Sequence, residues 1–298
     1  MDLSTGVHLI AFADSRMAAA TKRFNRQALK SGFFETVSVF SESSHLLSDW
    51  ITECDKRIGL GKGFGYWTWK PVLLQGIFDG LRQGDILIYS DIGNFVNHRG
   101  RKRFQEYVEM LRSGRASLIA FWQDRTAHGA RIEEAWTKED AFTFFSLGVN
   151  HPQRKTPQFC ANLLIFLVND TSGSVIADWA DLAKNETWLF TDECAAPNQP
   201  QFLDHRHDQS ILSLILKRHG VSPLSAGELE AQELHPGDVP NWKTQRTFPF
   251  QARRAKRRQY IETFSGLFFR FAGFMGWSRA ATDGFVGRIR KFSESRKG

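Results

Sequence analysis

Acidic residues follow two apolar runs, each at a position where a strand is expected to end. Asp14 comes after VHLIAF (7–12), and Asp91 comes after DILIYS (85–90). A carboxylate in such a place reaches a divalent cation or a sugar hydroxyl, and magnesium or manganese that bridges a diphosphate needs only one or two protein carboxylates. The alternative role of each acid is to cap the following helix or to form a turn.

The glycine- and tryptophan-rich segment GKGFGYWTWKP (61–71) is the second unusual feature. Glycines allow the backbone to come close to a ligand. Lys70 stands at the start of the next predicted helix, where the helix dipole disfavours a cation, so we expect an anionic partner such as phosphate. The alternative is an aromatic corner of the core in which the lysine stem lies along apolar surface. The segment lacks the GxxxxGK[ST] pattern of a phosphate-binding P-loop.

Imidazole, guanidinium, carboxylate and amide groups are concentrated in HRHDQS (205–210), where a loop is expected to enter a helix. The start of a helix favours anions and the guanidinium of Arg206 suits phosphate, so the segment is typical of a phosphate or oxyanion site. Alternatively, Asp208 or Ser210 caps the helix and the two histidines are surface residues. The sequence contains neither the HExxH spacing of metalloproteases nor the GxSxG motif of α/β-hydrolases.

The fold must bring these segments together. Apolar runs predict strands at 7–12, 35–40, 85–94, 116–122 and 158–170. Helical patterns predict helices at 16–31, 43–58, 70–84, 101–114, 138–148, 174–184 and 204–220. This alternation predicts an α/β fold with an open, mainly parallel sheet and helices on both faces, in one domain of residues 1–245. Ligands of such sheets bind beyond the carboxyl ends of the strands, where Asp14 and Asp91 are expected.

The excess positive charge is confined to the C-terminal segment. Residues 243–298 hold 14 Lys or Arg and three acids, a net charge of +11, whereas residues 1–242 carry a net charge of −4. Because basic residues lie beside Phe and Trp here, we expect the appendage 246–298 to bind an anionic membrane surface. A helical hairpin packed on the first domain, or binding of RNA or another polyanion, are the alternatives.

Composition narrows the class of protein. A chain of 298 residues with 42% hydrophobic residues is unlike a disordered protein. Its three cysteines form no CxxC pair, which argues against a disulfide framework and favours a reducing compartment. The sequence shows neither the ~18 consecutive apolar residues of a spanning helix nor a signal peptide. We therefore expect a cytoplasmic protein that is peripheral on the inner face of the membrane.

Several of these segments together resemble a known family. IAFADS, GFGYWTWKP, GDILIYSDIGN, QFCANLLIF and HRHDQSILSLI occur in this order between residues 7 and 220. The set resembles bacterial glycosyltransferases of the GT-A fold, which are associated with surface-polysaccharide, capsule and lipopolysaccharide biosynthesis. The resemblance implies an enzyme of the hexosyltransferase type with a GT-A-like nucleotide-diphospho-sugar transferase fold. It implies a nucleotide-sugar donor, commonly a UDP-sugar, and a glycan or lipid-linked glycan acceptor.

The resemblance also implies roles on the donor side of the site. Asp91 stands where the family has its DxD-type acid and is the expected contact to a metal ion and to the diphosphate. The segment SDIG offers one carboxylate where a DxD motif offers two, so the requirement for Mn²⁺ or Mg²⁺ stays open. Asp14 is expected near the nucleoside, and Trp69 and Lys70 near the pyrophosphate or the sugar.

The later segments are implied to form the acceptor side and the catalytic centre. Gln158 and Asn162 belong to the strand that lines the acceptor side in the resembled family. Asp208 and Gln209 match its late Asp-Gln pair near the sugar, which makes them candidate catalytic residues together with Asp91. His207, or its neighbour His205, is a candidate for a further metal or phosphate ligand.

Two other functions are compatible with parts of the sequence. A nucleotidyltransferase uses a similar sheet, but it is expected to have a phosphate-binding loop rich in glycine and basic residues directly after the first strand. Here the first strand continues as IAFADSRM, which contains no glycine. A non-catalytic protein that binds RNA or another polyanion would keep its binding after deletion of residues 243–298. Because residues 1–242 are mildly acidic, no nucleic-acid partner is expected.

Overall fold

A computed structural model describes residues 5–124, 129–231 and 245–252 of the chain. The chain divides into two units, Met1–Arg253 and Arg254–Gly298. All the described residues belong to the first unit. The predicted membrane-binding appendage lies outside the described residues, apart from residues 246–252. Residues 250–251 form a strand that pairs with residues 95–96 of the first unit.

The centre of the first unit is a five-stranded sheet. Its strands, in the order β2-β1-β3-β7-β5, are Thr36–Phe40, Val7–Phe12, Ile86–Ser90, Leu163–Leu167 and Leu118–Ile119. β1 is parallel to both β2 and β3, whereas β7 is antiparallel to β3 and to β5. Four strands therefore run in one direction and β7 runs against them. The predicted α/β fold with a mainly parallel sheet is confirmed.

The reversal of β7 follows from the path of the chain before it. After β5 and the short strand β6 (Phe121–Trp122), the chain leaves the sheet and returns only at Leu163. The intervening segment begins and ends at the edge where β3 ends, because Ser90 at the end of β3 pairs with Leu163 at the start of β7. A strand that enters from this edge must run back through the sheet. The amino end of β7 therefore lies beside the carboxyl end of β3.

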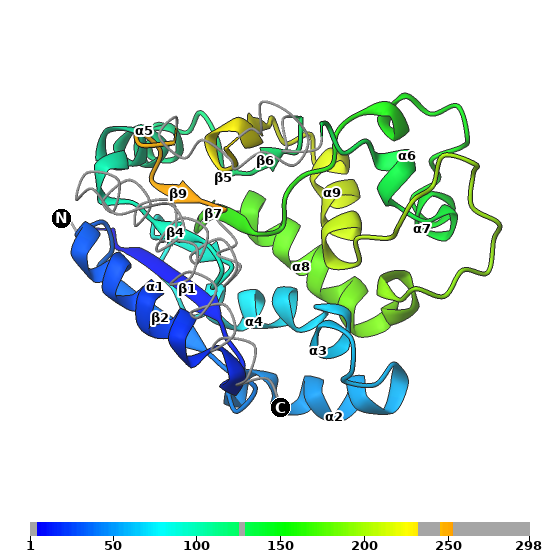
Figure 1. Cartoon of the computed structure of the whole chain (residues 1–298), viewed down its shortest axis with the longest axis horizontal. Coiled ribbons are helices and arrows are strands. Elements are labelled where there is room, and N and C mark those ends of the chain that lie inside the picture. Colours follow the sequence, from blue (N-terminus) through cyan, green and yellow to red (C-terminus); the bar gives the residue numbers. More distant parts are fainter. Residues whose placement is uncertain (1–4, 125–128, 232–244, 253–298) are drawn as a thin grey trace, which may run out of the picture. The chain divides into compact units, whose positions relative to one another are not determined.

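Helices cover both faces of the sheet, as predicted (Figure 1). Alternate strand residues point to opposite faces, and two separate apolar clusters result. One cluster joins Ile10, Leu87 and Phe166 to helices α4, α8 and α9, which span Trp69–Phe78, Asp170–Asn185 and Asp208–Arg218. The other joins Leu9 and Ile88 to helices α1 and α5, which span Ala18–Ser31 and Arg101–Arg112.

Shorter elements complete the unit. The remaining helices are α2 (Ser48–Arg57), α3 (Gly63–Tyr66), α6 (Glu133–Trp136) and α7 (Glu139–Phe144). Two small ladders pair β4 (Phe95–Val96) with β9 (Phe250–Gln251), and β6 with β8 (Leu224–Ser225). The predicted strand at 158–170 is shorter than expected, because only residues 163–167 pair in the sheet. Within the described residues, no helix has the length and apolar character needed to cross a membrane.

Candidate active site

Three of the predicted site residues meet beyond the carboxyl end of β3. The ammonium Nζ of Lys70 lies 2.5 Å from Oδ2 of Asp208 and 3.7 Å from Oδ1 of Asp91. It also donates a hydrogen bond of 3.2 Å to the carbonyl of Ala161, directly before β7. We call Lys70, Asp91 and Asp208 the charged cluster. It unites the first turn of α4, the end of β3 and the first residue of α9.

Burial explains why the cluster needs both signs of charge. Lys70 is 3% exposed and Asp208 is 6% exposed, and a buried ion without a partner costs several kcal/mol. Burial alone would lower the pKa of Lys70, but the carboxylates of Asp208 and Asp91 outweigh it and raise that pKa. Burial raises the pKa of Asp208 despite the neighbouring ammonium. The anionic partner expected for Lys70 is thus supplied, at least in part, by the chain itself.

Tyr89 joins the charged cluster and was not predicted from the sequence. Its hydroxyl donates a hydrogen bond of 2.7 Å to Oδ1 of Asp91, and the Lys70 ammonium lies 5.1 Å from the centre of its ring. Burial, followed by the nearby carboxylate of Asp91, raises the pKa of Tyr89 well above its usual value, so it is a hydrogen-bond donor at neutral pH. The sequence could have indicated Tyr89, because it stands two positions before Asp91 and residues two apart in an extended segment point to the same face.

Asp91 is the accessible acid of the cluster. Its side chain is 39% exposed, in contrast to 8% for Asp208. Tyr89 and Lys70 both approach Oδ1. A ligand that reaches this edge of the sheet therefore meets the Asp91 carboxylate more readily than any other charge of the cluster.

The segment before Lys70 has an unusual backbone. Five consecutive residues, 63–67, have positive φ angles between 52° and 77°, and the amide of Tyr66 donates to the carbonyl of Lys62 at 2.7 Å. This turn, α3, is left-handed. Each non-glycine residue in that conformation costs about 1–2 kcal/mol, and Phe64, Tyr66 and Trp67 all adopt it. Such strain persists only where packing offsets it, and it is common at functional sites.

The two glycines of the turn are required by packing as well as by φ. A Cβ at Gly65 would lie 2.4 Å from Sγ of Cys54, and a Cβ at Gly63 would lie 2.4 Å from the ring of Trp67. In contrast, a Cβ at Gly61 would have no atom within 4 Å. The glycine-rich pattern thus serves the close packing of this turn on α2.

His207 lies directly before Asp208 and has φ 51° and ψ −119°. Its ring stacks on Trp67, with 5.4 Å between ring centres and 22° between planes. Its Nδ1 is 2.8 Å from the carbonyl of Phe190, and its Nε2 is 3.7 Å from Oδ1 of Asp192. Burial lowers the pKa of His207, so the ring is neutral at pH 7. His205 is similarly occupied, since its Nε2 lies 2.9 Å from the carbonyl of Leu189.

These contacts bear on the predicted metal ligands. No contact joins His207 to Asp91, and within the described ranges no group of three or more His, Cys, Asp or Glu side chains is arranged to hold a metal ion. Within the charged cluster, Asp91 is the carboxylate that is accessible. The donor set therefore fits a cation that is bound mainly by substrate oxygens and water, with one protein carboxylate.

Gln158 and Gln209 belong to one buried amide network. Nε2 of Gln209 donates to Oε1 of Gln158 at 2.8 Å and to Oε1 of Gln123 at 2.9 Å. Nε2 of Gln158 lies within 3.1 Å of acceptors on Glu133 and Ser210. Gln158 is fully buried, so its polar atoms serve the protein interior. The network fixes the first turn of α9, where Asp208 lies.

Asn162 is a different case. Its carbonyl accepts the amide of Asp91 at 2.9 Å and the side-chain amide of Asn94 at 2.8 Å. Its own side-chain Oδ1 is buried and has no hydrogen-bond partner among the described residues. An unsatisfied buried acceptor costs about 1–3 kcal/mol.

Three further predicted residues make other contacts, although the ring centre of Trp69 lies 5.9 Å from the Lys70 ammonium. Asp14 follows β1 at the same edge of the sheet, but in the described structure its carboxylate pairs with Arg16, at 2.6 Å. Trp69 is 4% exposed and stacks on Phe12 with 4.0 Å between ring centres, so it is part of the core. Arg206 holds its guanidinium 5.3 Å from the ring centre of Trp136. The expected convergence thus holds for Lys70, Asp91 and Asp208, and among the contacts of the described residues none joins Asp14 to them.

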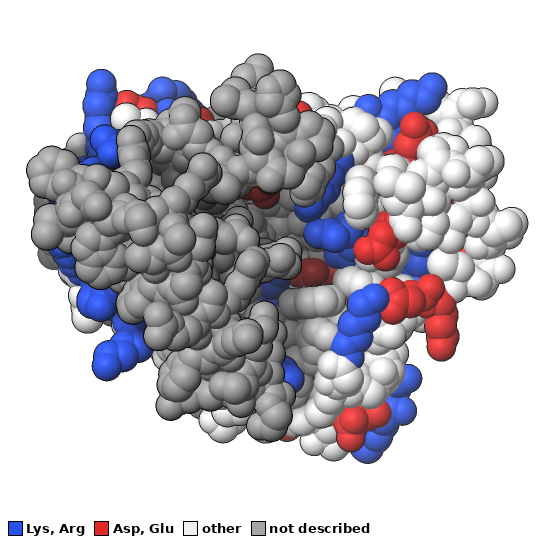
Figure 2. Space-filling model, viewed as in Figure 1, with Lys and Arg blue, Asp and Glu red and all other residues white. Residues whose placement is uncertain are grey.

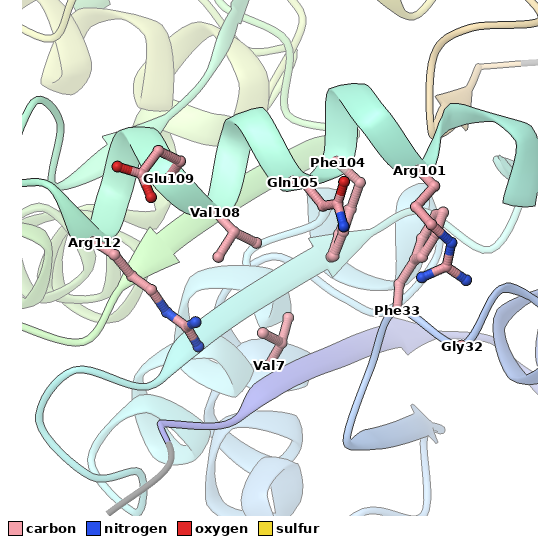
Figure 3. A pocket seen from close by; sticks show the side chains of 9 residues that line it. All are labelled: Val7, Gly32, Phe33, Arg101, Phe104, Gln105, Val108, Glu109 and Arg112. Carbon is pink, nitrogen blue, oxygen red and sulfur yellow. The ribbon is translucent and has the colours of Figure 1, made fainter. Parts of the chain in front are cut away.

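Two hollows of the molecule are distinct. Figure 2 shows acidic and basic side chains close together around a hollow in the middle of the face, beside the grey atoms. A separate pocket of about 250 Å³ lies between α5 and the first residue of β1, with Phe33, Arg101 and Arg112 among its lining residues (Figure 3). Val7 is where β1 begins, whereas the charged cluster lies beyond strand ends. The pocket shares no residue with the cluster.

Comparisons with known proteins return solved structures only. No family profile and no curated protein matches the sequence significantly. Mouse xyloside xylosyltransferase 1 matches over 74% of this chain and 84% of its own, with 12% identity and a TM-score of 0.38. The glycosyltransferase GlyE of Streptococcus pneumoniae TIGR4 matches over 75% of this chain, with 16% identity and a TM-score of 0.38. This chain spans 46% of GlyE, about half its length.

A third structure is a glycosyltransferase involved in the glycosylation of the major capsid of PBCV-1. It covers 95% of this chain and 99% of its own, with 7% identity and a TM-score of 0.42. All three proteins are glycosyltransferases. Similarity at this level carries no information about the activity of this chain, whose chemistry rests on its own residues.

Proposed function

We propose that this protein is a glycosyltransferase that takes a sugar from a nucleotide-diphosphate donor. The observation that carries the proposal is the charged cluster, in which Lys70 links Asp91 and Asp208 beyond the carboxyl end of β3. Open α/β sheets bind their ligands at this edge. The ordered motifs of the sequence, which resemble those of bacterial GT-A enzymes, supply the class of donor.

The charges of the cluster suit the separation of a sugar from a diphosphate. As the bond between C1 and the leaving oxygen breaks, the sugar gains oxocarbenium character, and a fixed carboxylate stabilises that positive charge. Asp208 is the proposed carboxylate, because the Lys70 ammonium and the start of α9 hold it in place. Asp91, the more exposed acid, is proposed to bind on the diphosphate side.

The cluster carries two carboxylates and one ammonium, so its net charge is −1 when all three groups are ionised. A diphosphate would be repelled unless a cation accompanied it. We propose that Asp91 holds a divalent cation, Mn²⁺ or Mg²⁺, together with the donor. When bound, such an ion neutralises charge on the leaving diphosphate. Lys70 then acts mainly by fixing the two carboxylates, since its own ammonium is buried and already hydrogen-bonded.

The finer assignments rest on the sequence. A UDP-sugar donor, a glycan or lipid-linked glycan acceptor, and a role in capsule or lipopolysaccharide biosynthesis follow from the family resemblance. Peripheral attachment to the inner face of the membrane follows from the basic, aromatic residues of 246–298. Liposome binding of the full chain and of a chain ending at residue 252 tests the last point. Loss of binding on truncation is expected, and equal binding would contradict it.

A thermal-shift screen tests the proposed function. The full chain is heated with a panel of nucleotide-diphospho-sugars, with and without MnCl₂. A ligand that binds only the native state raises its stability by about 2.7 kcal/mol at 100 times its Kd. We expect stabilisation by donors of one nucleoside, greater with manganese. Absence of stabilisation by every nucleotide sugar at millimolar concentration would contradict the proposal.

A further inference from the structure

We infer that the stacked rings of Trp67 and His207 position the ion pair between Lys70 and Asp208. We call these two rings the aromatic clasp. The clasp follows from geometry alone, whereas its importance for donor binding rests on the function proposed above. His207 is then a positioning residue for this ion pair.

The clasp joins the two chain segments directly beside the charges. Trp67 lies three residues before Lys70, and His207 lies immediately before Asp208. The two ring centres are 5.4 Å apart and the planes differ by 22°, which is a stacked arrangement. The stacked rings therefore link the start of α4 to the start of α9. The 2.5 Å contact between the Lys70 ammonium and the Asp208 carboxylate joins the same two helix starts.

Both residues of the clasp hold backbone conformations that favour glycine. Trp67 has φ 60°, and His207 has φ 51° with ψ −119°. A glycine would adopt either conformation at lower cost. The two side chains must therefore offset the cost of the strained backbone. We assign this stabilisation to the stacking contact between the two rings.

His207 is held from further directions as well. Its Nδ1 lies 2.8 Å from the carbonyl of Phe190, and the ring of Tyr66 is centred 5.2 Å away. The imidazole therefore has a fixed orientation before any ligand binds. Pre-organisation of this kind keeps supporting groups in place for a site that lies on other residues.

Replacement of either ring by glycine separates the clasp from backbone strain. His207→Gly and Trp67→Gly relieve the strained φ and remove only the side chain. Phe64→Gly is the matched control, because Phe64 has φ 53° in the same turn but stacks on Phe12 and contacts Trp50. His207→Phe keeps a ring for stacking and loses the hydrogen bond to Phe190. Circular dichroism and urea unfolding establish that each full-length variant is folded.

The readout is acylation of lysines by an amine-reactive ester, followed by peptide mass spectrometry. Lys70 is buried and ion-paired, so it should react at least about 100-fold more slowly than the exposed Lys22 in the original protein. The clasp predicts that His207→Gly and Trp67→Gly each raise the rate at Lys70 about tenfold, and that the double variant adds little more. His207→Phe should retain most of the protection, and Phe64→Gly should change it less than about twofold.

Unchanged protection in folded His207→Gly and Trp67→Gly would overturn the clasp. So would equal exposure of Lys70 in Phe64→Gly, since the whole turn would then be responsible. The labelling result does not depend on sugar transfer. If the original protein binds no nucleotide sugar, the proposed function fails while the clasp is still judged by Lys70 alone. If it binds one, the clasp further predicts a donor Kd raised about tenfold in His207→Gly with the control unchanged.

Discussion

The Lys70 ammonium and the Asp208 carboxylate lie 2.5 Å apart although 138 positions separate them in the chain. The pair is buried, and Asp91 approaches the same ammonium at 3.7 Å. Ionic contacts of Lys70 therefore join the start of α4 to the start of α9 and to the end of β3. The stability of the fold and the chemistry of the proposed site depend on the same three side chains.

Removal of the lysine should be costly for stability. Lys70→Met leaves Asp208 buried without its cation, and breaking a buried ion pair costs about 3–5 kcal/mol. We expect a loss of this size in the free energy of unfolding, measured in urea. The double variant Lys70→Met with Asp208→Asn should recover a large part of that loss, because no buried carboxylate is then left unpaired. Additive losses in the double variant would show that the two groups are not coupled.

Substitution of the turn glycines tests the left-handed segment. Gly65→Ala adds a Cβ that would lie 2.4 Å from Cys54 Sγ, at φ 77°. Strain of about 1–2 kcal/mol and overpacking of about 1–3 kcal/mol should together destabilise the protein by roughly 2–5 kcal/mol. Gly61→Ala, which meets no atom within 4 Å, is the control and should change stability by less than about 1 kcal/mol. A similar effect of both substitutions would contradict the close packing of the turn.

Acid should destabilise the fold through His205. Burial, reinforced by Lys138 and His207, lowers the pKa of His205 well below 6.5, so the folded state holds it neutral. The unfolded chain binds a proton below pH 6.5, and the free energy of unfolding therefore falls as the pH drops, by up to about 1.4 kcal/mol per pH unit. His205→Gln should reduce this slope between pH 6.5 and 5 relative to the original protein. An unchanged slope in His205→Gln would assign the acid sensitivity elsewhere.

Tyr89 should affect the proposed reaction through Asp91. Tyr89→Phe removes the hydrogen bond of 2.7 Å to the Asp91 carboxylate and should cost about 0.5–1.5 kcal/mol of stability. Tyr107 is the matched control. It is equally buried, it belongs to the other apolar cluster, and its hydroxyl donates a hydrogen bond to Glu228. Both variants should lose similar stability, but only Tyr89→Phe should lower kcat/KM, by roughly threefold to tenfold. Equal kcat/KM values in the two variants would separate Tyr89 from the site.

Local patterns were sufficient to predict the fold class and part of the site. Apolar runs with polar ends identified β1 and β3, and the rule that ligands bind beyond strand ends pointed to Asp91. The unusual composition around Lys70 and the charge-rich start of α9 indicated the other two members of the cluster. These features are encoded within a few residues, so a sequence displays them directly.

Features that depend on tertiary packing were not predicted. The stacking of Trp69 on Phe12 joins α4 to β1, a contact that no local pattern records. The direction of β7 depends on where the preceding 40-odd residues leave and re-enter the sheet, which no local pattern records. The stacking of Trp67 on His207 likewise joins distant segments. Asp14 was expected in the cluster because it ends a strand, yet it pairs with the adjacent Arg16.

The rate of sugar transfer by Asp91→Asn tests the central claim most directly. The donor is the nucleotide sugar that stabilises the original protein, and the control is Asp49→Asn on the exposed start of α2. We expect Asp91→Asn to unfold within about 1 kcal/mol of the original protein and to lose at least about 100-fold in kcat, with the control unchanged. Turnover of Asp91→Asn within twofold of the original would contradict a transferase site built on Lys70, Asp91 and Asp208.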